Sequence, residues 1–439
     1  MTIELRQRDI KHLWHPYTEI TSFEKMDFPI IERAQGVYLY EVGGRPVLDG
    51  IASWWCVNLG HSHPKLIEAL REQAGRLQHV ILGGMSHRKI IELAEQLAAI
   101  TPGALSHSFF SCDGASSVEA ALKIAVQYWV NNGEKGRTKF IGLADGYHGD
   151  TLGAMGVGYV DTFHSGFKGV IHRAYRAQSP HCAQCPHGQE PDACDVECFS
   201  SMDELIRNHC DETAAVVVEP LCQGAAGVRI YPEEYLRRLR KLCSQYGLLL
   251  IADEIAVGFG RTGSMFACKR AGIAPDMMTL GKGMTGGTLP MSAVIVTDTI
   301  YDSFRQEGAR DRTFYHGHTF CGNPITSAVA LAVLSVYEEE KILKNLRPRI
   351  AQLDAGMREL GVMLGNSKVR TLGMMGVVEV NANSGVIERA RRIARHAFEG
   401  GLFIRPLGRA VYLWPPLTIT EEELNRMLSI LRSAVEQTA

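Results

Sequence analysis

The sequence lacks the features that would assign it to a membrane or a nucleic acid. No apolar run approaches the roughly 20 residues that a membrane span needs. The first residues, MTIELRQRDIKHLWHPY, mix charges of both signs and have no apolar core, unlike a signal peptide. The formal net charge is −2 over 439 residues, so no strong positive field is available to attract an anionic partner. We therefore expect a cytoplasmic protein with no nucleic-acid or membrane partner.

Three further patterns are missing. No GxGxxG motif follows an early strand, which argues against a nicotinamide-binding protein. No internal repeat and no low-complexity tract is evident. The length instead favours a large core divided over two or three domains.

A regular disulfide framework is also missing, although cysteine itself is not. Eleven cysteines, an odd number scattered over a long chain, predict reduced thiols. Four of them form a CxxC and a CxxxC separated by eight residues and could bind zinc tetrahedrally. A polar surface insertion with incidental cysteines is the favoured interpretation, because this segment is remote in sequence from the other candidate residues. The four are Cys182, Cys185, Cys194 and Cys198.

The order of predicted elements indicates an α/β fold. Strands and helices alternate from Ser106 to Thr297, which is typical of a mainly parallel sheet covered by helices. From Ile325 onward a long helix leads into a smaller α+β portion. Its expected strands lie near Gly376–Val380, Leu402–Arg405 and Ala410–Leu413, and a terminal amphipathic helix runs from Glu421 to about Glu436.

Two predicted buried strands end in residues that suggest cofactor chemistry. The apolar run Leu248–Ala252 leads into Asp253 and Glu254, and the run Met277–Leu280 leads to Lys282 between two glycines. Ligands bind at the carboxyl edge of open α/β sheets. An acid and a lysine at that edge suggest a pyridoxal phosphate site, with the lysine as Schiff base and the acid on the pyridinium nitrogen. A solvated loop lysine and an ordinary helix N-cap would explain the same features separately.

Two other turns would complete such a site. After the predicted strand His107–Cys112, the segment Asp113–Ser117 opens a helix with a glycine and two hydroxyls. Free N–H groups and the helix dipole at such a terminus can bind phosphate. Tyr147 follows the predicted strand Lys139–Leu143, where its ring could stack on a flat cofactor.

The adjacent indoles of Trp54 and Trp55 are a candidate pocket wall. If DGIASWWCVNLG, from Asp49 to Gly60, is a strand, the two side chains face opposite ways. One would then serve the core and leave the other for a pocket, although a purely structural pair is an equally good interpretation.

Five motifs in order carry a resemblance over nearly the whole chain. They are DGASSVEAALK at Asp113–Lys123, DGYHGDT at Asp145–Thr151, ADEIAVGFGRTG at Ala252–Gly263, LGKGMTGG at Leu280–Gly287 and HGHTFCGNP at His316–Pro324. Together they resemble those of the class III (fold type I) pyridoxal phosphate aminotransferases. The resemblance implies pyridoxal 5′-phosphate as cofactor and a homodimer with active sites at the subunit interface.

The resemblance also implies how the chain is divided. A large cofactor-binding α/β domain would span residues 71–325. The N-terminal segment 1–70 would join residues 326–439 to make a small α+β domain.

Within that family the chain is similar to members that act in biotin biosynthesis. WHPYT at Trp14–Thr18, ASWWCVNLGHSHP at Ala52–Pro64 and IRPLGRAVYLWPP at Ile404–Pro416 carry this likeness. It implies that S-adenosylmethionine donates an amino group to 8-amino-7-oxononanoate, giving 7,8-diaminononanoate. The alternatives are another ω-amino acid or diamine transaminase of the family, lysine as donor, and a non-catalytic binding protein built on a decayed transaminase.

The family's cofactor roles carry over to individual residues. Lys282 matches the Schiff-base lysine, Asp253 the acid on the pyridine nitrogen, and Tyr147 the tyrosine that stacks on the ring and faces substrate. Gly114 and Ala115 match the backbone phosphate cup, with alanine where serine is common. The resemblance further implies that a pair reaches the phosphate across the dimer interface, with histidine where proline is often found: His318 and Thr319.

Four more residues match substrate-contacting positions of the family. Tyr17 matches the residue associated with choosing S-adenosylmethionine as donor. Trp54 and Gly317 match other contacts. Arg405 would suit the distal carboxylate of the keto acid, because a guanidinium binds a carboxylate in a fork.

Overall fold

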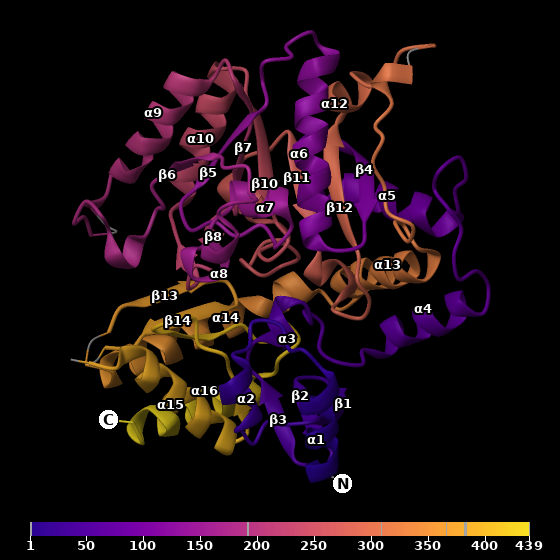
Figure 1. Ribbon diagram of the computed structural model, residues 1–439. Helices are drawn as coiled ribbons and strands as arrows, with labels where there is room; N and C mark the ends of the chain where they lie inside the picture. The colour runs from indigo at the N-terminus through magenta and orange to yellow at the C-terminus, as the bar shows by residue number, and fades with distance from the viewer. Residues whose placement is uncertain (1, 191–192, 309, 366, 382–383, 439) are drawn as a thin grey trace.

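The computed structural model describes residues 2–190, 193–308, 310–365, 367–381 and 384–438 (Figure 1). Its largest sheet has seven strands in the order β4-β12-β11-β10-β7-β5-β6. All neighbouring pairs are parallel except those of β12, which runs antiparallel to β4 and β11. The α/β fold and the mainly parallel sheet are therefore confirmed. The strands are β4 (Leu105–Ser111), β5 (Lys139–Leu143), β6 (Tyr175–Ala177), β7 (Thr213–Val218), β10 (Leu249–Asp253), β11 (Met277–Leu280) and β12 (Ser292–Thr297).

Helices cover both faces of this sheet. Every residue of β7 is buried, and its alternate side chains enter two different hydrophobic clusters. Val216 lies in the cluster that contains Leu239 of α10, whereas Val217 lies in the cluster that contains Val118 of α6. Successive side chains of a strand point to opposite faces, so an unbroken apolar run is what a strand between two helix layers requires. These helices are α6 (Gly114–Asn131), α9 (Ser200–His209) and α10 (Glu233–Gln245).

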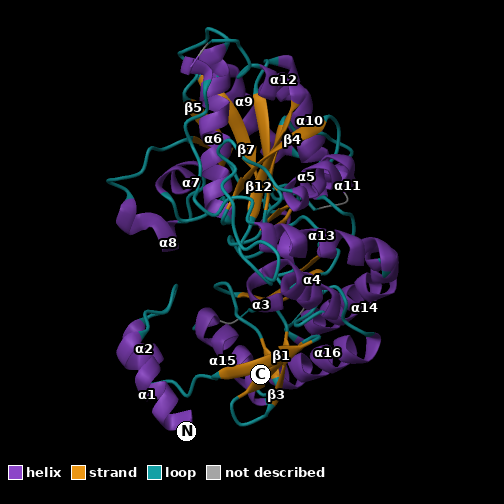
Figure 2. Cartoon of the chain, turned by 90° about the vertical axis from the view of Figure 1, so that its right-hand side faces the viewer, coloured by secondary structure: helices purple, strands orange, loops and turns teal. Residues whose placement is uncertain are grey.

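The two ends of the chain share a second sheet. The strands β1, β2 and β3 form an antiparallel meander, and β15 from the C-terminal part adds to β3 in parallel. Figures 1 and 2 show the N-terminal strands beside α15 and α16, below the large sheet. The strand expected at Leu402–Arg405 ends early, so Arg405 follows it in a loop. The bounds are β1 (Ile31–Gln35), β2 (Tyr38–Glu41), β3 (Pro46–Asp49) and β15 (Leu402–Phe403).

The remaining strands form two small antiparallel sheets. One has the order β13-β14-β16 and packs against α14, and the other is the pair β8-β9. Their bounds are β8 (Cys222–Gln223), β9 (Arg229–Ile230), β13 (Val369–Leu372), β14 (Met375–Glu379) and β16 (Ala410–Leu413).

Other helices connect or flank the sheets. The helix α13 packs against both α4 and α5, and α16 packs against α14 and α15. Within the described residues, none of the helices has the length and apolar character needed to cross a membrane. The α-helices not yet given are α1 (Thr2–His12), α2 (Ile20–Glu24), α3 (Ala52–Trp55), α4 (Pro64–Ala74), α5 (Arg88–Ile100), α7 (Leu152–Val157), α8 (Asp161–His164), α11 (Ala267–Ala271), α12 (Asp298–Asp302), α13 (Pro324–Glu339), α14 (Ile342–Met363), α15 (Val386–Glu399) and α16 (Glu421–Glu436). Short 3₁₀ turns include η2 (Cys182–Gln184), η4 (Glu197–Phe199) and η5 (Lys282–Thr285).

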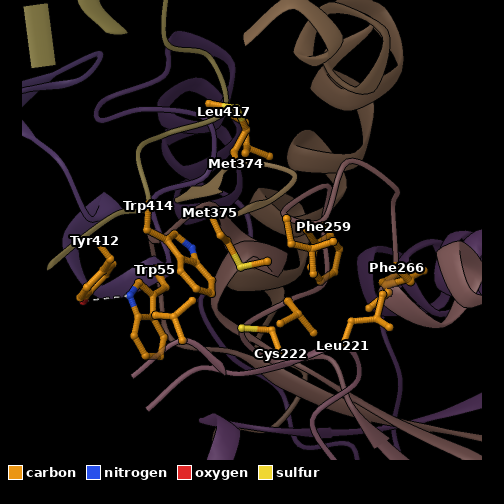
Figure 3. Close-up of a cluster of buried hydrophobic side chains, with 14 of the residues drawn as sticks. Trp55, Leu221, Cys222, Phe259, Phe266, Met374, Met375, Tyr412, Trp414 and Leu417 are labelled. Carbon is orange, nitrogen blue, oxygen red and sulfur yellow. Dashed lines mark hydrogen bonds between the residues drawn. The ribbon is translucent and has the colours of Figure 1, made fainter. Parts of the chain in front are cut away.

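One cluster of buried hydrophobic side chains combines residues from distant parts of the chain, among them Trp55, Phe259 and Trp414 (Figure 3). The Trp55 ring stacks on Trp414 with centroids 4.9 Å apart. Arg261, 5.3 Å from the centre of the Trp414 ring, is fully buried and donates to the Pro415 carbonyl at 2.7 Å and to Asn58 Oδ1 at 2.9 Å. Burial lowers the pKa of Arg261 to about 9. This guanidinium therefore ties three distant segments together through neutral oxygens.

Candidate active site

Asp253 lies at the end of β10 with its carboxylate almost completely buried. Oδ1 accepts from the Thr279 hydroxyl and from the Ile255 N–H, both at 3.1 Å. Oδ2 lies 2.6 Å from Nδ1 of His148. These contacts come from the neighbouring strand β11, from the turn after β10 and from the loop of His148, so the carboxylate is held in one orientation.

His148 is a site residue that the sequence reasoning missed. Burial alone would lower the pKa of its imidazole, but the hydrogen bond and charge of Asp253 outweigh burial and raise the pKa above its ordinary value. The histidine therefore favours the charged form beside the carboxylate. Its position directly after Tyr147 in the DGYHGDT motif is the signal that could have identified it.

The adjacent acid, Glu254, has a different role. Its two oxygens accept from the backbone N–H groups of Ala267 and Cys268, at 2.9 and 2.7 Å, which are the first two residues of α11. Burial raises the pKa of Glu254 to about 7. Of the Asp-Glu pair, Glu254 thus pairs with free N–H groups at the N-terminus of α11.

Lys282 follows β11 at the start of η5 with a left-handed φ of 41°. Burial lowers the pKa of its ammonium below the usual range, and the charge of Asp253 offsets only part of this effect. Its Nζ lies 5.6 Å from the centre of the Trp55 ring. A lysine with a lowered pKa has more of the neutral amine that acts as a nucleophile or a base.

The N-terminus of α6 forms one corner of the site. Asp113 is the N-cap residue, and its Oδ1 accepts from the Ser116 N–H at 2.9 Å. The first N–H groups of a helix have no intrahelical acceptor and carry the positive end of the dipole. Gly149 packs so closely on Ala115 that a Cβ there would collide with the alanine side chain. The loop 145–151 is therefore held against this corner.

Tyr147, Tyr17 and Asp150 form a hydrogen-bonded cluster. The Tyr17 hydroxyl donates to Asp150 Oδ2 at 2.5 Å, and the Tyr147 hydroxyl donates to the same oxygen at 3.0 Å. Burial, and then the hydrogen bond to Asp150, raise the pKa of Tyr17 to about 12. Burial also raises the pKa of Tyr147 well above its usual value. Both phenols therefore stay protonated, and each donates its single proton to Asp150.

Glu219 holds the backbone of this cluster at Tyr147. The sequence reasoning gave it no role in the site. One oxygen accepts from the Tyr147 N–H at 3.0 Å and the other from the Gly224 N–H at 2.9 Å. Burial raises the pKa of Glu219 to about 7, while the charge of His148 opposes that rise. The glutamate thus fixes the backbone that carries Tyr147.

Trp54 and Trp55 are not in a strand, so the alternation considered for a strand does not apply to their side chains. They end α3, a single left-handed turn in which Ala52, Ser53, Trp54 and Trp55 all have positive φ. Each such non-glycine residue costs roughly 1–2 kcal/mol relative to the right-handed form. The turn nevertheless divides the two indoles as expected, because Trp55 is buried and Trp54 is 41% exposed.

Trp54 stands beside Arg405 and Tyr17. The Arg405 guanidinium lies 4.8 Å from the centre of the Trp54 ring, and the Tyr17 ring meets it edge-on at 5.6 Å. Arg405 also donates to the Tyr17 carbonyl at 3.1 Å. The structure therefore brings the three predicted substrate contacts together from distant parts of the chain.

Gly317, His318 and Thr319 are not among the residues that line this site within one chain. The His318 ring packs edge-on against His316 with centroids 5.1 Å apart, and His316 lies 3.2 Å from the Lys123 ammonium. Their predicted contact with phosphate across a dimer interface stays a prediction.

Two connected cavities occupy the space between these groups. The inner one, of about 480 Å³, is lined by Asp253, Lys282, Tyr147 and the first residues of α6. The outer cleft, of about 760 Å³, shares Lys282 and Tyr147 and extends to Tyr17, Trp54 and Arg405.

The inner cavity fits pyridoxal 5′-phosphate. Its wall offers a helix N-terminus for the phosphate at Gly114 and Ala115, a buried carboxylate at Asp253 and an amine at Lys282. The Thr151 hydroxyl lines the same cavity, is buried and has no hydrogen-bond partner. Buried polar groups are normally paired, so this hydroxyl favours a polar ligand beside it.

The eleven cysteines are all free thiols, as predicted. Burial raises the pKa of Cys182 to about 11 and that of Cys198 to about 12, and in both cases neighbouring thiols of the four-cysteine segment add to the rise. In the described part of the chain, which leaves out residues 191–192 of this segment, no three His, Cys, Asp or Glu side chains are arranged to hold a metal ion.

Comparison with known proteins gives close relatives over the full length. The family described as "Aminotransferase class-III" matches residues 22–435. A protein from Nitratidesulfovibrio vulgaris named adenosylmethionine-8-amino-7-oxononanoate aminotransferase is 41% identical over 443 residues, which cover 99% of this chain and 82% of that relative. A protein of the same name from Geobacter sulfurreducens is 38% identical over 442 residues, covering 99% and 98%.

Solved structures agree with the sequence relatives. The adenosylmethionine-8-amino-7-oxononanoate aminotransferase of Methanocaldococcus jannaschii superposes with a TM-score of 0.93 at 37% identity, covering 100% of this chain and 99% of that one. An amine transaminase from an uncultivated Pseudomonas species, solved in its PLP-bound (internal aldimine) form, gives a TM-score of 0.93 at 32% identity, covering 98% and 99%.

Proposed function

The chain belongs to the class-III aminotransferase family, and on that premise we propose that it transfers the amino group of S-adenosylmethionine to 8-amino-7-oxononanoate, giving 7,8-diaminononanoate for biotin biosynthesis. We further propose that pyridoxal 5′-phosphate is its cofactor. The observation that carries the proposal is that Lys282 and Asp253 line one cavity, which is continuous with the cleft of Tyr17, Trp54 and Arg405.

Pyridoxal phosphate, when bound, supplies a carbonyl carbon that takes up the donor's amino group and a ring that stores an electron pair. Asp253 would hold the proton on the ring nitrogen, with His148 fixing its second oxygen. Gly114 and Ala115 would bind the phosphate through backbone N–H groups. Tyr147 would cover one face of the ring.

Lys282 would act as the base of the reaction. Its lowered pKa favours the neutral amine, which can take the proton from Cα of the donor. The same ammonium can then deliver that proton to the cofactor carbon that received nitrogen. With the keto acid the two transfers run in the opposite order. One lysine thus serves both half-reactions.

The outer cleft would hold the two substrates in turn. Arg405 would bind a carboxylate in bidentate fashion, and Trp54 would pack against the apolar part of either substrate. The Tyr17 hydroxyl, already bonded to Asp150, would distinguish S-adenosylmethionine from other donors. Aromatic walls make few directional demands, which suits a cleft that accepts two unlike molecules.

The assembly is part of the proposal. We propose a homodimer in which Gly317 contacts the partner's substrate, and His318 and Thr319 contact the partner's cofactor phosphate. Residues 71–325 would form the large domain, and residues 1–70 would join residues 326–439 in the small one. The expected location is the cytoplasm.

Single-turnover spectroscopy tests the donor and the acceptor separately. The cofactor absorbance of the purified holoenzyme is followed while S-adenosylmethionine, lysine, glutamate or 7,8-diaminononanoate is added alone. We expect S-adenosylmethionine and the diamine to convert the cofactor to its amine form. Conversion by lysine or glutamate instead of S-adenosylmethionine would change the proposed donor. No conversion by 7,8-diaminononanoate would refute the proposed acceptor and favour another ω-amino acid or diamine transaminase.

A further inference from the structure

The turn Ala52–Trp55 needs support from outside itself. Its four residues have φ values of 48°, 44°, 71° and 72°, a region that residues with a Cβ seldom adopt. Its internal hydrogen bonds include Trp55 N–H to the Ile51 carbonyl at 2.9 Å and Cys56 N–H to the Ala52 carbonyl at 3.1 Å. A strained turn persists at a functional site only when the surrounding structure holds it in place.

Asp49 supplies that support from the end of β3. Its side chain is fully buried. Oδ1 accepts from the Ile51 N–H at 3.2 Å, and Oδ2 accepts from the Ser53 hydroxyl at 2.7 Å. The carboxylate therefore holds Ile51, which precedes the turn, and Ser53, the second residue of the turn.

His61 fixes the carboxylate in turn. Its Nε2 lies 2.9 Å from Asp49 Oδ2. The His61 backbone is itself anchored, because it exchanges two hydrogen bonds with Gly36, at 2.7 and 3.0 Å. Asp49 Oδ2 thus has a second fixed partner beside the Ser53 hydroxyl.

The same strand end also positions the segment that carries Arg405. Asp49 pairs in register with Phe403 of β15, and the Gly50 N–H donates to the Phe403 carbonyl at 2.9 Å. Trp54 from the turn and Arg405 from that segment then meet at 4.8 Å. Asp49 is not among the described residues that line the cavity or the cleft.

We propose that Asp49 is a positioning residue for substrate: its buried carboxylate holds the left-handed turn that sets Trp54 against Tyr17 and Arg405. The identity of the substrate rests on the function proposed above, whereas the placement of Trp54 does not. Asp49 would act through Trp54 and touch no reacting atom. Its removal therefore changes how well substrate is held more than how fast a bound substrate reacts.

Kinetics of two Asp49 variants separate these effects. We expect Asp49→Ala to raise KM for the keto acid by about tenfold or more while kcat stays within about threefold of the unchanged enzyme, the pattern of lost uniform binding. We expect Asp49→Asn to restore KM to within about threefold, because the amide oxygen still accepts from Ile51 and the amide nitrogen can donate to Ser53. The cofactor absorbance of both variants is expected to remain.

Tryptophan quenching tests the placement of Trp54 without any reaction. In a Trp14→Phe background, Trp54 becomes the exposed tryptophan, because Trp55, Trp129 and Trp414 are all buried. We expect Asp49→Ala to increase quenching of the emission by acrylamide, and Asp49→Asn to leave it near the background value.

The matched control is Asp354→Ala, which removes a carboxylate on α14 that accepts from Thr371 and Arg358 at 2.5 and 2.8 Å. It is expected to change thermal stability without changing KM or quenching. If Asp49→Ala does not fold, Ser53→Ala removes one contact of the same carboxylate and is expected to raise KM by more than the roughly threefold change allowed for Asp49→Asn.

Two results would overturn the role of Asp49. One is unchanged quenching together with unchanged KM in Asp49→Ala, or in Ser53→Ala where that variant has to be used. The other is an effect on both that Asp354→Ala reproduces. If the unchanged enzyme does not use the proposed substrates, the proposed function fails, and the quenching comparison still decides the role of Asp49.

Discussion

The inner cavity and the outer cleft are built in different ways. Asp253, Lys282 and the start of α6 follow strands of one sheet, where the register of β10 and β11 fixes their separation. Tyr17 and Arg405 instead come from loops, and Trp54 from the turn α3, all outside the large sheet. The inner cavity therefore inherits the rigidity of the sheet, whereas the outer cleft depends on side-chain contacts such as those of Asp49 and Asp150.

The first way to sharpen this contrast is to remove the central group of the inner cavity. We expect Lys282→Ala to lower turnover by about 10⁴-fold or more, because it deletes both the nucleophile and the proposed base. Folding is expected to persist, since a single sheet-edge side chain is lost. Circular dichroism and steady-state rates check this, and appreciable turnover in the variant would refute the assignment of Lys282.

Neighbouring carboxylates allow a second comparison within the inner cavity. We expect Asp253→Asn to lower kcat by about 10³-fold, because a neutral amide beside His148 cannot hold a proton on the ring nitrogen in the same way. We expect Glu254→Gln to keep kcat within about threefold, because Glu254 caps α11 and faces no ligand. Equal losses in the two variants would show that the pair acts as one structural unit.

The outer cleft is tested at Tyr17. We expect Tyr17→Phe to lower kcat/KM for S-adenosylmethionine by about 10- to 100-fold, because Asp150 loses the donor at 2.5 Å and the cleft loses a hydroxyl. Cofactor affinity is expected to remain, since the inner cavity is untouched. Tyr40→Phe on β2 is the matched control for loss of a phenol. Unchanged donor kinetics would exclude Tyr17 from substrate recognition.

The smallest expected effect is on the pH dependence of folding stability, and it does not involve catalysis. The pKa of Glu254 is raised by burial to about 7 in the folded protein, above its ordinary value of 4.5, so the folded state holds a proton that the unfolded state releases. Stability from this group is present below about pH 4.5 and is lost as pH rises through about 7. Glu254→Gln is therefore expected to cost about 2 kcal/mol at pH 5 and less at pH 8. Urea unfolding at both pH values measures this loss of stability. A loss that grows with pH would contradict the prediction.

Sequence reasoning reached the inner cavity more completely than the outer cleft. The strands at Lys139–Leu143 and Met277–Leu280 were predicted with the bounds that the structure gives. Continuous apolar runs identify buried strands, and parallel strands must bring Asp253 and Lys282 to one edge. The family resemblance, confirmed by the relatives, then supplied the substrate contacts, whose predicted roles remain to be tested.

The structure added what periodicity cannot express. The left-handed turn Ala52–Trp55 contains no glycine and is stabilised by Asp49 and the surrounding core. No local sequence pattern therefore predicts it. The pairing of His148 with Asp253 depends on a distance between a loop and the end of β10. Tertiary contacts decide both features, so a pattern read along the chain could not give them.

The contact between Arg405 and the Tyr17 carbonyl has a consequence for how the protein is synthesised. The two residues lie 388 positions apart. At usual elongation rates a ribosome needs on the order of half a minute to make the intervening chain. During that time the nascent polypeptide can form the large sheet but has no complete substrate cleft. Substrate therefore cannot be engaged until translation of the chain is nearly finished.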